Sequence, residues 1–120
     1  MCIRDRDELP VITQTSDLLV WILGHTAKFP RNHRYGIGTR IEKQFYDLIE
    51  SLIKAKFSKE KHQILENAAI NAQQIQLLIR IATKAKIFPH RSHRHACSEI
   101  QSIIQSILRW RRSMSVLSDS

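Results

Sequence analysis

The stretch from Pro89 to Cys97, "PHRSHRHAC", gathers four side chains of the types that bind metal ions in proteins: His90, His93, His95 and Cys97. On a helix, His93 and Cys97 would lie one turn apart. Zinc sites, however, usually use paired Cys-x-x-Cys or His-x3-His ligands, and the two arginines of this stretch would repel a cation. We therefore expect no metal or cofactor here, but a basic helix entry whose imidazoles respond to pH.

Catalysis is the second kind of chemistry to test against the sequence. Arg91 and His95 are separated by three residues, one too few for the Arg-His motif of small helical ribonucleases. No Ser-His-Asp arrangement and no pair of carboxylates stands out elsewhere. We expect the protein not to be an enzyme.

The glycines of "FPRNHRYGIGTRIE", residues 29–42, suggest a phosphate-binding loop. A Walker loop requires G-x-x-x-x-G-K-[ST], and a dinucleotide loop requires a third glycine and a preceding strand. Neither condition is met by Gly36 and Gly38. We expect instead a helix stopped at Pro30 and a new helix capped by Asn32. Both glycines then lie inside a helix, where they reduce stability unless another helix or chain approaches closely.

Charge is the strongest functional signal of the 120-residue chain, whose formal net charge is +8. Residues 61–120 carry nine Lys and Arg against three Asp and Glu, whereas residues 1–60 carry ten against eight. Such a field favours an anionic partner, and nucleic acid ranks ahead of an acidic protein or a membrane surface. A soluble surface that is simply basic is the alternative.

Four segments have helical periodicity, and signals for strands or hairpins are scarce. The expected helices cover residues 13–29, 33–57, 59–88 and 92–114. Short connections make neighbouring helices antiparallel, so we expect an all-α, up-down-up-down four-helix bundle. The expected division is an N-terminal tail over residues 1–10, the bundle over 11–113 and a C-terminal tail over 114–120.

Apolar stripes predict which face of each helix is buried. The stripes are Leu18, Ile22, His25, Phe29; Ile37, Ile41, Phe45, Leu48, Leu52, Ala55; Ile64, Ala68, Asn71, Ile75, Leu78, Ala82, Ala85; and Ala96, Ile100, Ile103, Ile107, Trp110. Thr15 or Ser16 is the expected cap of the first helix and Ser58 of the third, while Pro89 is expected to end the third.

The cellular setting follows from what the sequence lacks. No run approaches the roughly 18 apolar residues of a membrane span. The N-terminus, "MCIRDRDELP", has no apolar signal-peptide core, and Cys2 and Cys97 do not form a disulfide framework. We expect a cytoplasmic protein without a membrane partner.

The segment "LLVWILGHTAKFPRNHRYGIGTRIEKQFYDLIESLIKA", residues 18–55, resembles the four-helix-bundle family that contains the accessory variability determinant (Avd) of diversity-generating retroelements. Proteins encoded in 23S rRNA intervening sequences are related to this family. The matching positions are Trp21, Lys28, Phe29, Pro30, Arg31, Arg34, Tyr35, Gly38, Arg40, Ile41 and Glu42. The family pattern has other residues at Asn32, Ile37 and Arg109, and the resemblance covers about residues 10–113.

The resemblance implies a non-enzymatic protein that assembles into a homopentameric barrel. It also implies that the barrel binds a reverse transcriptase and its template RNA and supports mutagenic copying into cDNA. The intervening-sequence relatives imply an alternative, a protein-interaction or scaffold module without a polymerase. The "RIE" sequence after Thr39 favours the Avd branch.

Basic residues are the candidate contacts to nucleic acid or to the polymerase. They are Arg31, Arg34, Arg40, Arg80, Lys84, Lys86, Arg91, Arg94, Arg109, Arg111 and Arg112. Arg34 and Arg40 have a structural alternative, ion pairing with Glu42 or with acids of a neighbouring protomer. Trp110 continues an apolar stripe, so we expect it in the core or at a protomer interface, although base stacking is also possible.

Overall fold

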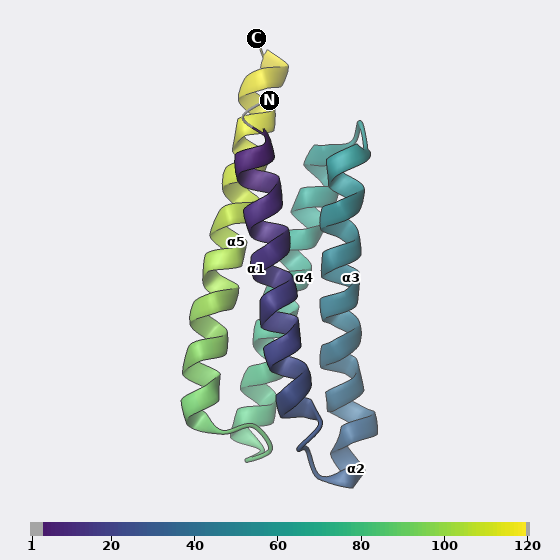
Figure 1. The fold of residues 1–120 in the computed structure, drawn as a ribbon, viewed down its shortest axis with the longest axis vertical. Coiled ribbons are helices and arrows are strands. Elements are labelled where there is room, and N and C mark those ends of the chain that lie inside the picture. Colours follow the sequence, from purple (N-terminus) through teal and green to yellow (C-terminus); the bar gives the residue numbers. More distant parts are fainter. Residues whose placement is uncertain (1–3, 120) are drawn as a thin grey trace.

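The computed structural model describes the backbone of residues 4–119 and the side chains of residues 10–114. Four long helices form an antiparallel bundle 52 Å long and 23 × 21 Å across (Figure 1). They are α1 (Arg4–Thr26), α3 (Thr39–Phe57), α4 (Lys61–Lys84) and α5 (His90–Asp119). The short helix α2 (Arg31–His33) and the π-helical turn η1 (Arg34–Gly38) connect α1 to α3. The predicted all-α four-helix bundle is confirmed.

Each helix packs against two others. Both α1 and α4 contact α3 and α5, so α1 and α4 occupy opposite corners of the bundle. Because the chain runs up and down, the end of α1, the start of α3, the end of α4 and the start of α5 meet at one end (Figure 1). Side chains from four separate parts of the sequence therefore gather there.

The predicted stripes of α3 and α5 are confirmed as core, except that Ile37 lies in η1 and is only partly buried. On α3 the buried residues are Ile41, Phe45, Leu48, Leu52 and Ala55, and on α5 they include Ala96, Ile100, Ile103, Ile107 and Trp110. Burial of each large apolar side chain contributes about 1.5–3 kcal/mol. Trp110 is fully buried, so the core prediction for this residue is right and no stacking surface is available on its ring.

The predicted stripe of α4 is partly wrong. Ala68, Ile75 and Ala82 are buried as expected, but the buried face continues through Leu65, Ala69, Ala72 and Ile79. Asn71 and Leu78 are only partly buried and Ala85 is exposed. The reason is that α4 has apolar residues at adjacent positions all along its length. The sequence therefore allows two overlapping stripes, and either could be the buried face.

Three expected helix caps are wrong: Thr15, Ser16 and Ser58. Helix α1 begins before the first two of these residues. Their hydroxyls donate to the carbonyls of Val11 and Ile12 inside the helix, at 2.7 and 2.9 Å. Ser58 follows the end of α3, and its Oγ accepts the Glu60 N–H at 3.0 Å in the connection to α4.

Asn32 is not a cap either, because helix α2 begins one residue earlier, at Arg31. The carbonyl of Pro30 accepts the N–H groups of His33 and Arg34. Similarly, α4 ends at Lys84, before Pro89, and Pro89 instead starts α5 by accepting the His93 N–H at 2.9 Å.

The first and last helices, α1 and α5, extend beyond their expected bounds toward the two ends of the chain. Helix α1 begins at Arg4 and continues through Pro10, and α5 continues to Asp119. Cys2 lies outside the described residues. The division into a bundle over 11–113 and two tails stays a prediction.

Candidate nucleic-acid interface

Nine basic side chains surround the end of the bundle where α1 and α4 finish and α3 and α5 begin. They are Lys28, Arg31, Arg34, Arg40, Arg80, Lys84, Lys86, Arg91 and Arg94, all exposed, and we call them the basic pole. The two sequence segments that supply them, 24–41 and 76–98, contain no Asp or Glu. This end therefore presents unbalanced positive charge.

Buried aromatic rings pack against the connections that carry the basic pole. The buried Phe29 ring fills the space beside Gly38, where an added Cβ would lie 3.2 Å from Phe29 Cδ2. Phe29 also meets the buried Phe88 edge-on, with ring centroids 6.3 Å apart. The two connections of the pole, from α1 to α3 and from α4 to α5, are thus packed against each other.

A second contact holds the start of α5 on α1. His25 Nδ1 donates to the Trp21 carbonyl at 3.0 Å, and its Nε2 lies 2.9 Å from Ser92 Oγ. Trp21 packs on both His25 and His95, at centroid distances of 4.1 and 4.8 Å. This aromatic cluster fixes the helix that carries Arg91 and Arg94.

The charges of the pole are not neutralised within the protomer. Among residues with described side chains, no member of the pole forms a salt bridge. Glu42 accepts a short hydrogen bond from Thr26 Oγ1, and neither Arg34 nor Arg40 pairs with it. Pairing of these arginines with acids of a neighbouring protomer remains the structural alternative.

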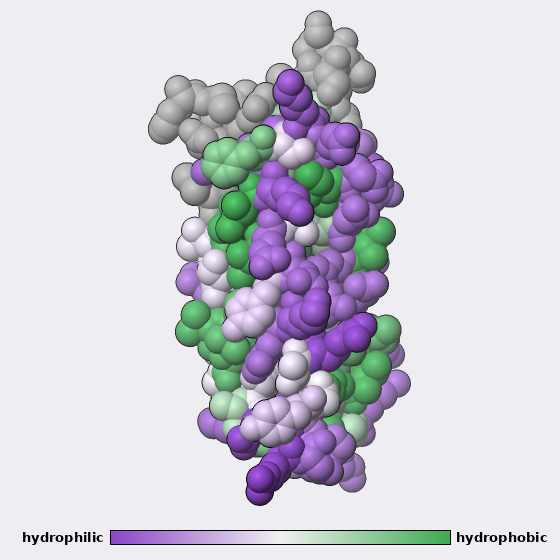
Figure 2. All heavy atoms as spheres, turned by 90° about the vertical axis from the view of Figure 1, so that its right-hand side faces the viewer, coloured by the Kyte–Doolittle hydropathy of each residue, from purple (hydrophilic) through white to green (hydrophobic). Residues whose placement is uncertain are grey.

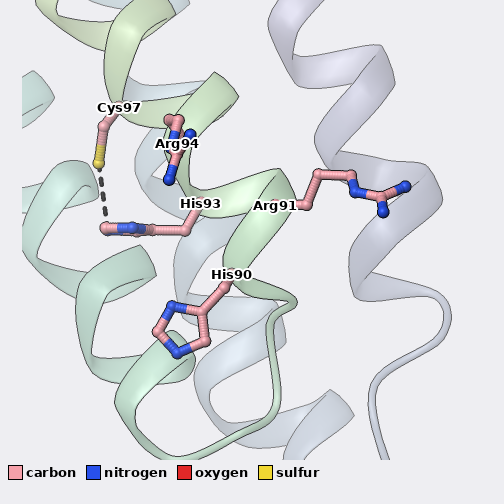
Figure 3. Close-up of a pocket in the computed structure, with 5 residues that line it drawn as sticks. All are labelled: His90, Arg91, His93, Arg94 and Cys97. Carbon is pink, nitrogen blue, oxygen red and sulfur yellow. Dashed lines mark hydrogen bonds between the residues drawn. The ribbon is translucent and has the colours of Figure 1, made fainter.

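Two open depressions adjoin each other along the α4–α5 side of the pole. One, of about 560 Å³, is lined by His90, Arg91, His93, Arg94 and Cys97 (Figure 3). The other, of about 490 Å³, is lined by Gln73, Gln76, Leu77, Arg80, His93 and Cys97. Since His93 and Cys97 line both, the two depressions adjoin, and we call them together the channel; Arg80, Arg91 and Arg94 are cationic donors on its walls.

A third, smaller depression of about 220 Å³ lies between α3 and α4. It is lined by Arg40, Gln44, Gln74, Leu77 and Leu78. Leu77 borders this depression and the α4–α5 channel, so Arg40 and Arg80 lie on either side of the same leucine. The cationic surface thus continues around the bundle from α3 to α5.

The thiol at the centre of the channel is a poor nucleophile. Cys97 Sγ lies 3.2 Å from His93 Nε2 (Figure 3). Burial raises the pKa of the Cys97 thiol above its ordinary value, and the positive charge of Arg80 opposes this effect. Among the described residues, no group of three His, Cys, Asp or Glu side chains is placed to hold a metal ion. The raised pKa disfavours the thiolate, the form in which a cysteine acts as a nucleophile.

A family model described as bAvd-like matches residues 10–114 of the chain. The protein belongs to the bAvd-like family. The match spans parts of all four long helices and includes every residue of the basic pole, and the family suggests an Avd-type accessory protein. No curated protein and no solved structure matches the chain.

The remaining candidate arginines of this bAvd-like chain lie near the opposite end of α5. Arg109 and Arg112 are exposed. Arg111 instead binds α4: its Nε donates to the His62 carbonyl at 3.3 Å and its guanidinium lies 3.5 Å from Glu66. The structure therefore does not bring these three together with the pole, and Arg111 has a structural contact.

Sequence reasoning left several residues of this surface out. Lys28 was recognised only as part of the family motif, although its charge and its place beside Pro30 were visible. Gln73 and Gln76 line the channel, and nothing in the sequence distinguishes them from other surface glutamines. Within the described part of the bAvd-like chain, no helix is long and apolar enough to cross a membrane.

Proposed function

We propose that this bAvd-like protein is the non-catalytic accessory protein of a diversity-generating retroelement. It binds the element's reverse transcriptase and template RNA in the cytoplasm and supports mutagenic cDNA synthesis. The observation that carries the proposal is the basic pole, nine exposed Lys and Arg side chains within segments that contain no acid. Membership of the bAvd-like family supports the polymerase as the second partner.

The pole would hold RNA through its backbone. Arginine and lysine side chains at the ends of helices reach phosphates of any sequence, and such contacts position a nucleic acid without reading its bases. Each neutralised phosphate releases counterions, so the affinity should fall steeply with salt. Arg109 and Arg112 would extend the contact for an RNA that follows α5, whereas Arg111 chiefly attaches α5 to α4.

Copies of this chain would assemble through exposed apolar faces of α3 and α4. Six exposed large apolar side chains lie on these two helices: Tyr46, Ile53 and Phe57 on α3, and Ile70, Leu77 and Ile81 on α4. Each set follows i, i+7, i+11 spacing and therefore lines one face of its helix. In the view onto α3, hydrophobic side chains flank a central hydrophilic strip (Figure 2). Burial of these faces in a homopentameric barrel would bring five basic poles together.

The test is co-purification. The chain is co-expressed with a reverse transcriptase and template RNA of a diversity-generating retroelement, and complexes are recovered through a tag on the polymerase. We expect both the chain and the RNA in the complex, and loss of RNA when Arg80, Lys84, Arg91 and Arg94 are changed together to Gln. Recovery of neither partner would contradict the proposal and favour the scaffold alternative. In that case the exposed apolar faces of α3 and α4 would bind another protein.

A further inference from the structure

Tyr35 is an exposed aromatic residue of the turn η1, directly after Arg34 of the basic pole. Its side chain is 77% exposed, although it belongs to the folded turn η1 and not to a loose loop. Arg31 and Arg34 precede it within one turn. A ring this exposed gains little from burial within the protomer and is available to a partner.

The backbone around Tyr35 is fixed by its neighbours. Gly38 is buried against Phe29, and Thr39 Oγ1 donates to the Arg34 carbonyl at 3.0 Å. The next residue, Gly36, has no atom within 4 Å of the position its Cβ would take. The ring is therefore presented on an ordered turn beside open space, which lowers the entropic cost of stacking a planar group on it.

We propose that Tyr35 stacks on an unpaired base, so that the pole selects single-stranded over duplex RNA. The inference rests on the proposed function, because it concerns the same RNA surface. Cationic side chains next to an exposed aromatic ring are the combination that binds single strands, since every base offers a flat face. In a duplex the bases are already stacked on each other and cannot reach the ring.

The other exposed aromatic residues of η1 and α3 lie in different surroundings. Tyr46 is 48% exposed, and on α3 it has Glu42 and Glu50 one turn away on either side, which would repel phosphates. Phe57 is at the other end of α3, and the ammonium of Lys56 lies 5.7 Å from its ring centroid. Tyr35 alone of these three is surrounded by unpaired arginines, which is why we assign base stacking to it.

The experiment compares Tyr35→Ala and Tyr35→Phe with the wild type. Its control is Val20→Ala, at an exposed apolar residue of α1 that belongs neither to the pole nor to the apolar faces of α3 and α4. Fluorescence anisotropy measures binding of an unstructured pyrimidine RNA of about 12 nucleotides and of a duplex of the same length. We expect Tyr35→Ala to lose about 5- to 100-fold in affinity for the single strand and little for the duplex. Tyr35→Phe should retain most of the affinity, and the affinity of Val20→Ala should be unchanged.

Photo-crosslinking supplies a readout that a structural role would not change. A single strand containing 5-iodouridine should crosslink at Tyr35, as located by mass spectrometry, and the crosslink should disappear in Tyr35→Ala.

Equal affinity of Tyr35→Ala and wild type for the single strand would overturn the inference and leave the proposed function standing. A loss in Tyr35→Phe as large as in Tyr35→Ala, or a change in oligomer mass, would also overturn it, the latter by placing the ring against a second copy. Failure of the wild type to bind either RNA would overturn the proposed function as well.

Discussion

The Phe29 ring and Gly38 are packed so closely that an alanine Cβ at residue 38 would lie 3.2 Å from Phe29 Cδ2 and 3.5 Å from the His33 carbonyl oxygen. Phe29 is 3% exposed and is held on its other side by Phe88. The glycine thus allows the connection between α1 and α3 to close over the core. Gly36 differs from Gly38, because no atom lies within 4 Å of the position that an added Cβ would take there.

Gly38→Ala should lower the free energy of unfolding by about 1 kcal/mol, since the clash with Phe29 outweighs the gain in helix propensity. Gly24→Ala is the matched control, because Gly24 lies within α1 with no atom within 4 Å of its Cβ position. It should raise the free energy of unfolding by up to about 1 kcal/mol. Urea unfolding followed by circular dichroism measures both. A gain in stability from Gly38→Ala would show that the Phe29 contact is loose.

Lys86 is the one non-glycine residue of the described chain with a left-handed backbone, at φ 63°. It follows the end of α4, where Ile87 N–H donates to the Ala82 carbonyl at 2.9 Å, a helix ending that usually employs glycine. Lys86→Gly should therefore stabilise the fold by about 1 kcal/mol while removing one charge from the pole. Thermal unfolding tests this, and a lower melting temperature would contradict it.

Arg80 and Lys84 share one face of α4 beside the channel, and neither has an ion-pair partner among the described residues. The double change Arg80→Gln, Lys84→Gln should reduce the slope of log affinity against log salt by about 1.4–1.8, as expected for two lost phosphate contacts. Lys43→Gln is the control, because Lys43 pairs with Asp47 at 3.1 Å outside the pole. Anisotropy titrations between about 50 and 200 mM salt measure the slopes. Equal slopes for the double variant and the control would rule out RNA contact at this face.

Cys97 should be alkylated slowly, because burial raises the pKa of its thiol. In a Cys2→Ser background, the pH midpoint of the alkylation rate should lie above the ordinary value of 9.0 in the folded protein and near it in denaturant. The corresponding contribution to stability is complete below that ordinary value and is lost as pH rises through the raised pKa. Arg80→Gln should move the midpoint higher still, since Arg80 lowers the pKa of the thiol. A folded-state midpoint below 9.0 would contradict this account of the channel.

The sequence predicted the fold wherever one face of a helix was apolar and the other polar. Helix α5 has Ile100, Ile103 and Ile107 on a single stripe among serines and glutamines, so its buried face was unambiguous. Helix α4 has pairs such as Ile64–Leu65 and Leu78–Ile79, in which only the second residue is fully buried, and a period alone cannot decide which member of each pair faces the core. The choice is made by packing against α3 and α5.

The candidate site was predictable in its charge and not in its geometry. The basic residues could be listed from the sequence, but their gathering at one end depends on the antiparallel path of all four helices (Figure 1). The contact of Arg111 with Glu66 depends on the register between α4 and α5, which periodicity does not give. The exposure of Tyr35 likewise depends on the π-helical turn, which shifts the phase of the residues before α3.

The most direct test of the central claim is the solution mass of the purified protein, alone and with a structured RNA that has single-stranded loops. Light scattering after size exclusion, at about 50 and 200 mM salt, gives both the number of chains and the amount of bound RNA. The account predicts a ring of about five chains that binds RNA at low salt and releases much of it at high salt. A monomer that does not bind RNA at either salt concentration would contradict it.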